Sequence, residues 1–158
     1  MIFVTVGSQK FPFNRLIEKV DQMAGEKVIT EEVFIQTGAG SYIPRSCSYQ
    51  AFYDRDHFTD MIEQCSILIT HGGAGTVVDA VKRRKKVIVV PRLARYGEHV
   101  NDHQLQLARK FYEMNLAYIC RDLNDLPKMV ERIRNHVFDS YSSNTEAFLA
   151  SVDKFICC

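Results

Sequence analysis

Tryptophan is absent from the 158 residues, and long apolar runs are missing as well. No stretch approaches the roughly 18 apolar residues of a membrane-spanning helix, so no integral membrane segment is expected. The opening residues, MIFVTVG, have neither the basic start nor the apolar length of a secretory signal peptide. The sequence therefore favours a cytoplasmic chain.

Cysteine is scarce and is badly spaced for a metal or for disulfides. The five cysteines include no CxxC pair and no Cys/His spacing typical of zinc ligands. No metal, no cofactor and no disulfide framework is therefore expected. The ending Cys157-Cys158 has two interpretations: free thiols, which we favour because the ending is not a CaaX box, or a site of lipid attachment.

Charge of one sign is not in excess. Twenty basic residues face nineteen acidic ones, a formal net charge of +1, which provides no global field for binding nucleic acid. One basic run, KRRKK at residues 82–86, is either the solvated end of a helix or a patch attracted to an anionic membrane. The length and the ordinary globular composition predict one domain over residues 1–158.

Apolar residues alternate between strand-like and helix-like spacing along the chain. Short runs such as 2–6 and 66–70 are typical of strands buried on both faces, whereas 13–27 has helical spacing. Strands that alternate with helices indicate an α/β, Rossmann-like, doubly wound parallel sheet. We predict strands at 2–6, 33–36, 47–52, 66–70, 87–90 and 117–120 and helices at 13–27, 58–65, 75–84, 101–114, 123–137 and 145–155.

The strongest local motif is HGGAGT at residues 71–76, between a predicted strand and a predicted helix. Glycines let the backbone approach a ligand, and the first turn of a helix offers unpaired N–H groups with a partial positive charge. The motif therefore predicts a cradle for a phosphate or diphosphate, although a turn that only tightens a strand–helix connection is the alternative. It is neither a dinucleotide fingerprint, which would follow the first strand, nor a P-loop, which needs GKS or GKT.

Polar residues follow the motif at two places where a ligand can be recognised. Asp79 lies one helical turn beyond Thr76, where a carboxylate either accepts hydrogen bonds from a ribose or only favours the helix dipole. The segment EHVNDHQ at residues 98–104 suits a polyhydroxylated ligand, with helix capping as the alternative. His99 and His103 are spaced i, i+4, but no third metal ligand accompanies them.

In combination these segments resemble the C-terminal, donor-binding half of family 28 glycosyltransferases, which have the two-lobed GT-B fold. The pattern is HGGxGT, an acid three residues later, Val-Pro after the next strand and DxQ at the next helix. Here it occupies 71–76, Asp79, Val90-Pro91 and 102–104. The likeness is closest to the small soluble subunits of split, two-chain members. These are the bacterial galactosyl- or glucuronosyltransferase subunits of capsule and exopolysaccharide synthesis, and the catalytic subunit of the eukaryotic dolichol-linked GlcNAc transferase.

The resemblance implies a role for each matched residue. The HGGAGT turn would hold the diphosphate of a UDP-sugar, the turn after the first strand would face it, and Asp79 would hold the ribose, although the family more often has Glu there. Backbone near Tyr53 would recognise uracil, and the start of the helix after Pro91 would recognise the donor sugar. The predicted substrate-binding set is Gly7, Ser8, Tyr53, His71, Gly72, Gly73, Ala74, Gly75, Thr76, Asp79, Asp102, His103 and Gln104.

The resemblance also implies an inverting hexosyl transfer from a UDP-sugar to a lipid-diphosphate-linked saccharide. The helix start at the glycine-rich turn can stabilise the departing UDP without a metal. The catalytic base is unknown, because it normally belongs to the acceptor lobe; His99 and Glu98 are the candidates in this chain. We expect transfer only with a membrane-anchored, acceptor-binding partner subunit, which would hold the chain peripherally at the inner face of the membrane. An isolated chain could also form a homodimer.

Other functions stay open at this point. A non-catalytic UDP-sugar-binding or enhancer module would share the donor pocket, and GlcNAc transfer in dolichol-linked N-glycan assembly is the alternative to capsule synthesis. A nicotinamide-dependent oxidoreductase fragment is disfavoured because no GxGxxG follows the first strand. Arg92 and Arg95 would favour a carboxylated sugar such as glucuronate by bidentate pairing, although contact with phosphate or solvent fits equally well.

Overall fold

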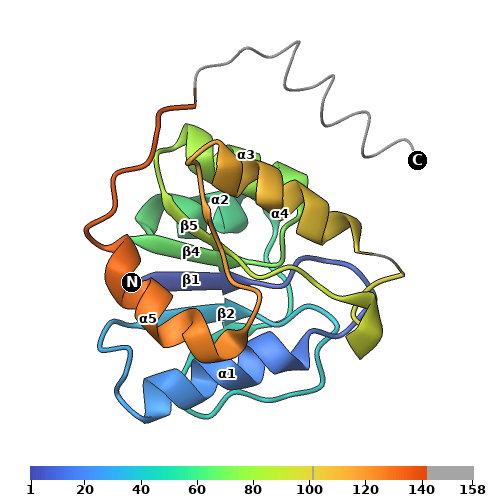
Figure 1. Ribbon diagram of the computed structural model, residues 1–158. Helices are drawn as coiled ribbons and strands as arrows, with labels where there is room; N and C mark the ends of the chain where they lie inside the picture. The colour runs from blue at the N-terminus through green and yellow to red at the C-terminus, as the bar shows by residue number, and fades with distance from the viewer. Residues whose placement is uncertain (101, 142–158) are drawn as a thin grey trace.

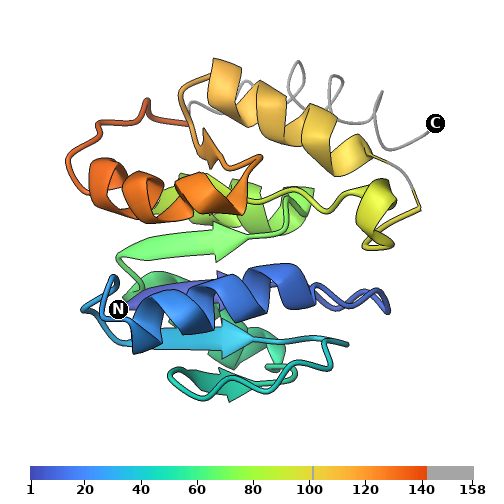
Figure 2. The same cartoon turned by 60° about the horizontal axis from the view of Figure 1, so that its bottom comes forward.

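The computed structural model of the chain describes residues 1–100 and 102–141. A six-stranded sheet forms the middle layer in the order β3-β2-β1-β4-β5-β6, all neighbours are parallel, and helices cover both faces (Figures 1 and 2). The chain starts in the middle of the sheet and winds outwards first to one side and then to the other. This is the doubly wound, Rossmann-like α/β fold that the sequence predicts.

Each predicted strand is present, as is each predicted helix before residue 137, with some ends displaced by a few residues. The predicted helix at 145–155 and the pair Cys157-Cys158 lie outside the described residues. The strands are β1 (Ile2–Thr5), β2 (Val33–Gln36), β3 (Ser48–Gln50), β4 (Ile67–Thr70), β5 (Lys86–Val89) and β6 (Tyr118–Ile119). The helices are α1 (Asn14–Gly25), α2 (Arg55–Gln64), α3 (Ala74–Lys82), α4 (His103–Glu113) and α5 (Leu126–Ile133), with 3-10 turns η1 (Ala94–Tyr96) and η2 (Leu123–Asp125).

Two hydrophobic layers hold the helices on the sheet. Helices α1 and α5 cover one face, and α2, α3 and α4 cover the other. Because successive strand residues point to opposite faces, Val4 and Ile69 pack toward α1 and α5, whereas Phe3 and Leu68 pack toward the other three helices. All four side chains are fully buried, which explains why the strands read as unbroken apolar runs.

Two helix ends differ from the apolar pattern. Helix α2 begins at Arg55 rather than at 58, because the carboxylate of Asp54 accepts a hydrogen bond from the His57 N–H and caps the helix there. Helix α5 ends at Ile133 rather than at 137. The next N–H groups make shorter i→i−3 bonds, and His136 turns away to bond Asn115, its Nε2 lying 2.8 Å from the amide oxygen.

The basic run at 82–86 lies at the end of α3, on the edge of the sheet where the strands begin. Lys85 donates to two main-chain carbonyls at the end of α2, and Lys86 donates to the carbonyl of Arg134 after α5. Arg83 pairs with one acid on α2 and one on α3. Three of these cations therefore bind helix ends or acids of the same fold, which favours the helix-end interpretation over a membrane patch. Among the described residues, none of the helices combines the length and apolar character needed to cross a bilayer.

Candidate functional site

Loops from four neighbouring strands meet at the edge where the strands end (Figure 2). The chain leaves β1 toward β2 on one side, whereas β4 and β5 extend the sheet on the other side. A ligand in a doubly wound sheet binds at this point, beyond the carboxyl ends of the strands. Gly7 follows β1 and His71 follows β4, so the two predicted halves of the diphosphate cradle lie next to each other here.

The imidazole of His71 fills the space between these two turns. A Cβ added at Gly7 would lie 2.6 Å from His71 Cε1, and one added at Gly73 would lie 2.6 Å from His71 Nε2. Both positions need glycine because the ring occupies the volume of a side chain. Gly7 also has a φ of +76°, in the left-handed region that favours glycine. His71 therefore sets the separation between the two turns.

Burial makes His71 a neutral side chain at pH 7. Its pKa is lowered to about 4, mainly by desolvation and in the same direction by the positive charge of Arg92, while a hydrogen bond to the backbone of Thr5 opposes part of the shift. A neutral imidazole can exchange hydrogen bonds with a phosphate but brings no charge to it. Positive potential at this turn has to come from backbone N–H groups instead.

The first turn of α3 is open. Its N-cap is Gly73, no side chain of the described residues caps it, and a Cβ added at Gly75 would meet no atom within 4 Å. Uncapped N–H groups beside unfilled space are what an anion needs at a helix start. The glycine at 75 thus lacks the structural reason that Gly7 and Gly73 have.

The predicted sugar-recognition residue touches the same turn. Gly72 has a φ of +92°, and a Cβ added there would lie 3.6 Å from Gln104 Cβ. The side chain of Gln104 is buried at the start of α4, where its Oε1 accepts a hydrogen bond from the Arg92 N–H at 3.1 Å. The cradle and the start of α4 therefore form one continuous surface.

Asp102 and Glu98 are engaged within the protein. Asp102 precedes α4 but does not cap it, because its Oδ1 accepts a hydrogen bond from the Ala94 N–H at 2.9 Å. The buried Glu98 carboxylate accepts from Arg15 Nε at 2.8 Å, Arg15 Nη2 at 3.0 Å and the Leu93 N–H at 3.0 Å. Three donors favour a structural role for Glu98 over that of a base.

The remaining predicted residues lie around this edge. His103 is the first residue of α4, and the ring of His99 lies 5.9 Å from that of Phe11. Tyr53 packs edge-to-face on Phe3, with ring centroids 5.9 Å apart, and burial raises the pKa of its phenol. Within residues 1–100 and 102–141, no group of three or more His, Cys, Asp or Glu side chains is arranged to hold a metal ion.

Arg92 is a residue whose role the sequence does not reveal. It is fully buried and donates to the main-chain carbonyls of Val6 at 2.6 Å, Phe11 at 2.6 Å and Glu98 at 3.1 Å. Pairing of Arg92 with a sugar carboxylate is therefore wrong, because its guanidinium is enclosed. Arg95 is exposed and lines a pocket of about 180 Å³ together with Arg121 and Leu105. The only feature of the sequence that hints at the buried role of Arg92 is its position, since it is a charged residue directly after an apolar strand and a proline.

Asp79 pairs with Arg83 across one helical turn, Oδ1 lying 3.0 Å from Nε, and its side chain is 41% exposed. If the second oxygen holds a ribose, Asp79→Ala weakens UDP binding about tenfold or more, the loss of a charge-assisted hydrogen bond. Calorimetric titration measures this. Arg83→Met is the matched control, since it removes the ion pair but keeps the carboxylate. Unchanged affinity in a folded Asp79→Ala variant would remove Asp79 from the site.

The sequence matches a known family over almost its whole length. The glycosyltransferase family 28 C-terminal domain is matched by residues 1–156. The chain belongs to this family. The resemblance that the HGGAGT motif and its flanking residues carry is thereby confirmed, and the fold of this family 28 domain agrees with the membership.

Relatives and solved structures agree with this assignment. The chain is 24% identical over 131 residues to the human UDP-N-acetylglucosamine transferase subunit ALG13, and 23% identical over 125 residues to the mouse protein. The matches cover 75% of this chain but only 11% and 10% of those proteins, so the chain spans about a tenth of their length. It matches an NMR structure of ALG13 with a TM-score of 0.63 and 17% identity, over 93% of this chain and 92% of the other. The calicheamicin glycosyltransferase CalG4 is matched with a TM-score of 0.64 and 15% identity, over 85% of this chain and 34% of that chain.

Proposed function

We propose that this family 28 domain is the UDP-sugar-binding, catalytic subunit of a two-chain inverting glycosyltransferase. It would transfer a hexose to a lipid-diphosphate-linked saccharide, in capsular or exopolysaccharide synthesis. The observation that carries the proposal is the open first turn of α3, where Gly75 leaves space beside uncapped N–H groups. Gln104, at the start of α4 and beside Gly72, would give a sugar attached to the diphosphate a polar neighbour.

The geometry supports stabilisation of the leaving group from this chain alone. As the bond between the sugar and the diphosphate breaks, negative charge grows on the UDP. N–H groups that already point at that position stabilise the charge without reorganisation and without a metal. Of the two candidate bases, Glu98 is held by Arg15 and by the Leu93 N–H, so its carboxylate is engaged within the fold. The base and the acceptor would come from a membrane-anchored partner subunit, which would also place this chain at the inner face of the membrane.

GlcNAc transfer is the second candidate. The relatives named above are UDP-N-acetylglucosamine transferase subunits, so UDP-GlcNAc is the first donor to test. UDP-galactose, UDP-glucose and UDP-glucuronate complete the panel. The exposed Arg95 is the residue of this loop that still fits a carboxylated sugar.

Calorimetric titration of the chain with UDP tests the proposal. EDTA is present throughout, and GDP and NAD(H) serve as controls. We expect UDP to bind without metal and the controls to stay silent. Binding of NAD(H) in place of UDP would instead point to an oxidoreductase fragment. Transfer activity that appears only on adding a membrane fraction with the partner subunit would separate a catalytic subunit from a non-catalytic binding module.

A further inference from the structure

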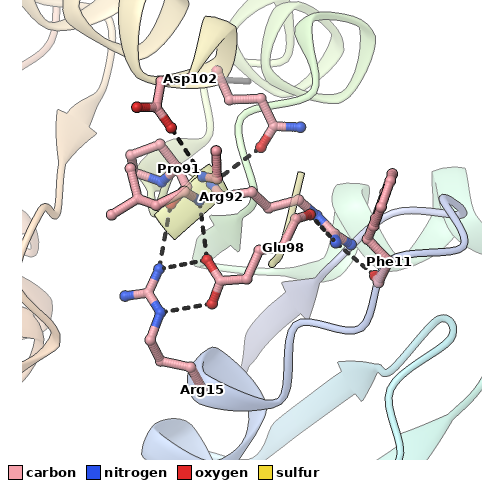
Figure 3. A network of polar contacts seen from close by, with 9 residues as sticks. Phe11, Arg15, Pro91, Arg92, Glu98 and Asp102 are labelled. Atoms are coloured by element: carbon pink, nitrogen blue, oxygen red, sulfur yellow. Dashed lines mark hydrogen bonds and ion pairs between the residues drawn. The ribbon is translucent and has the colours of Figure 1, made fainter. Parts of the chain in front are cut away.

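A buried polar network ties the loop after β5 to the turn after β1 (Figure 3). At its centre the guanidinium of Arg92 donates to three main-chain carbonyls, those of Val6, Phe11 and Glu98. Among the described residues, no carboxylate lies within ion-pair distance of it, and Phe13 stacks at 5.2 Å from its Cζ. A buried cation is costly unless its donors are satisfied. The three carbonyls satisfy Nη1 and Nη2, whereas Nε has no hydrogen-bond partner among the described residues, so it is the carbonyl contacts that hold these three segments together.

Glu98 completes the network from the other side. Arg15 of α1 donates hydrogen bonds to the Glu98 carboxylate through Nε and Nη2, and the Leu93 N–H donates to the same carboxylate. The loop from 91 to 98 is thus anchored at both ends, once to the turn after β1 and once to α1. The backbone of residue 92 has little freedom as a result.

That backbone is what holds Gln104. The Arg92 N–H donates to Gln104 Oε1 at 3.1 Å, and the Cβ of Gln104 packs against Gly72 of the cradle. A continuous chain of contacts therefore connects Val6, Arg92, Gln104 and Gly72. This contact uses one lone pair of Oε1, and the amide keeps the other lone pair and its Nε2 donors for further hydrogen bonds.

We infer that Arg92 is the positioning residue of the donor site: its N–H fixes the side-chain amide of Gln104 beside the cradle, where that amide contacts the sugar of the donor. The geometric part stands on the network alone. The statement about the sugar rests on the proposed function.

The first experiment needs no ligand. In two-dimensional NMR spectra, Gln104→Ala identifies the side-chain NH2 signals of Gln104 by their disappearance. Arg92→Met, which keeps length but loses all donors, should move those signals toward free-chain values and increase exchange of the residue-92 amide by about tenfold or more. Arg95→Met, an exposed arginine three residues on, is the matched control and should leave both unchanged. Unaltered Gln104 signals in folded Arg92→Met overturn the inference. If Arg92→Met does not fold, Arg92→Lys, which cannot reach three carbonyls, replaces it.

The second experiment uses UDP and UDP-GlcNAc as probes. The ratio of their Kd values should change by the same factor in Arg92→Met and in Gln104→Ala, and the double variant should show no further change. Equal weakening of both ligands by Arg92→Met would indicate a merely structural role and overturn the inference. A wild-type chain that binds neither probe would reject the proposed function, and the NMR result would then decide the geometric part.

Discussion

Replacement of Gly75 by alanine is expected to stabilise the free protein and to weaken UDP binding about tenfold or more. Gly75 lies in the first turn of α3, and a Cβ there meets no protein atom within 4 Å. Alanine favours helix by about 1 kcal/mol over glycine, so the free energy of unfolding should rise. The same methyl group projects into the space that the diphosphate would fill, so binding should weaken. Thermal unfolding and calorimetric titration give the two numbers independently.

Gly73→Ala is the matched variant two residues earlier. Its Cβ would lie 2.6 Å from His71 Nε2, so it should destabilise the fold by about 1–3 kcal/mol and disturb binding at the same time. If Gly75→Ala stabilises the fold and Gly73→Ala destabilises it, while both weaken UDP binding, then the loss of affinity in Gly75→Ala is a direct effect on the ligand and not a consequence of unfolding. Normal UDP affinity in a folded Gly75→Ala chain would show that the diphosphate does not sit on this turn.

The glycines of this motif show which features of the site the sequence predicts and which it does not. HGGAGT correctly predicts where the strand ends and the helix starts, because glycines beside an apolar strand have a local meaning. The favoured interpretation of the sequence assigns the glycines of the motif to the approach of a ligand, with a turn that only tightens the strand–helix connection as the alternative. In the structure, Gly73 is required because a side chain there would collide with the ring of His71. Gly7 is required for the same reason, although it lies 64 positions before His71 in the sequence. Only a three-dimensional contact can reveal a glycine of this kind.

The loop after β5 shows the same limit. Its polar residues are typical of a ligand-binding loop, and Gln104 does lie against the cradle. In the sequence, Arg92 and Glu98 look equally suitable for binding a ligand. In the structure, Arg92 donates to main-chain carbonyls and Glu98 pairs with Arg15, both inside the fold. Local pattern gives the position of a charged residue but not its burial, which depends on α1 and on the turn after β1. The short apolar runs of the strands can be recognised without knowledge of such a partner, which is why the sheet is predictable.

Acidification is expected to lower the stability of the protein through His71. Its pKa is about 4 in the folded chain, against 6.5 for an ordinary histidine. Between these values the unfolded chain binds a proton that the folded chain does not, so the free energy of unfolding falls as pH decreases and is unaffected above about 6.5. The expected loss from pH 7.5 to pH 5 is about 2 kcal/mol. Urea unfolding at several pH values measures it.

His57 has to be removed from this comparison. The Asp54 carboxylate raises the pKa of His57, so that residue adds stability below about pH 6.5 and loses it as pH rises, opposite to His71. The pH dependence of stability is therefore measured in a His57→Gln background, both with His71 present and with His71 replaced. The pKa values of Asp21 and Glu31 are lowered, so their contributions are lost only toward pH 4 and below. His71→Asn, which does not titrate, should abolish the slope between pH 6.5 and 5; a slope that persists would assign it to another group.

The same titration tests whether His71 faces the ligand. A diphosphate beside the imidazole favours its protonated form and raises its pKa toward the ordinary value. Linkage then requires that the ligand bind more tightly as pH falls from 6.5 to 5, and that saturating ligand flatten the loss of stability. UDP-GlcNAc is the better probe, because its diphosphate is esterified at both ends and does not titrate in this range. Affinity that is independent of pH would mean that His71 only separates the two turns and that backbone N–H groups alone hold the charge.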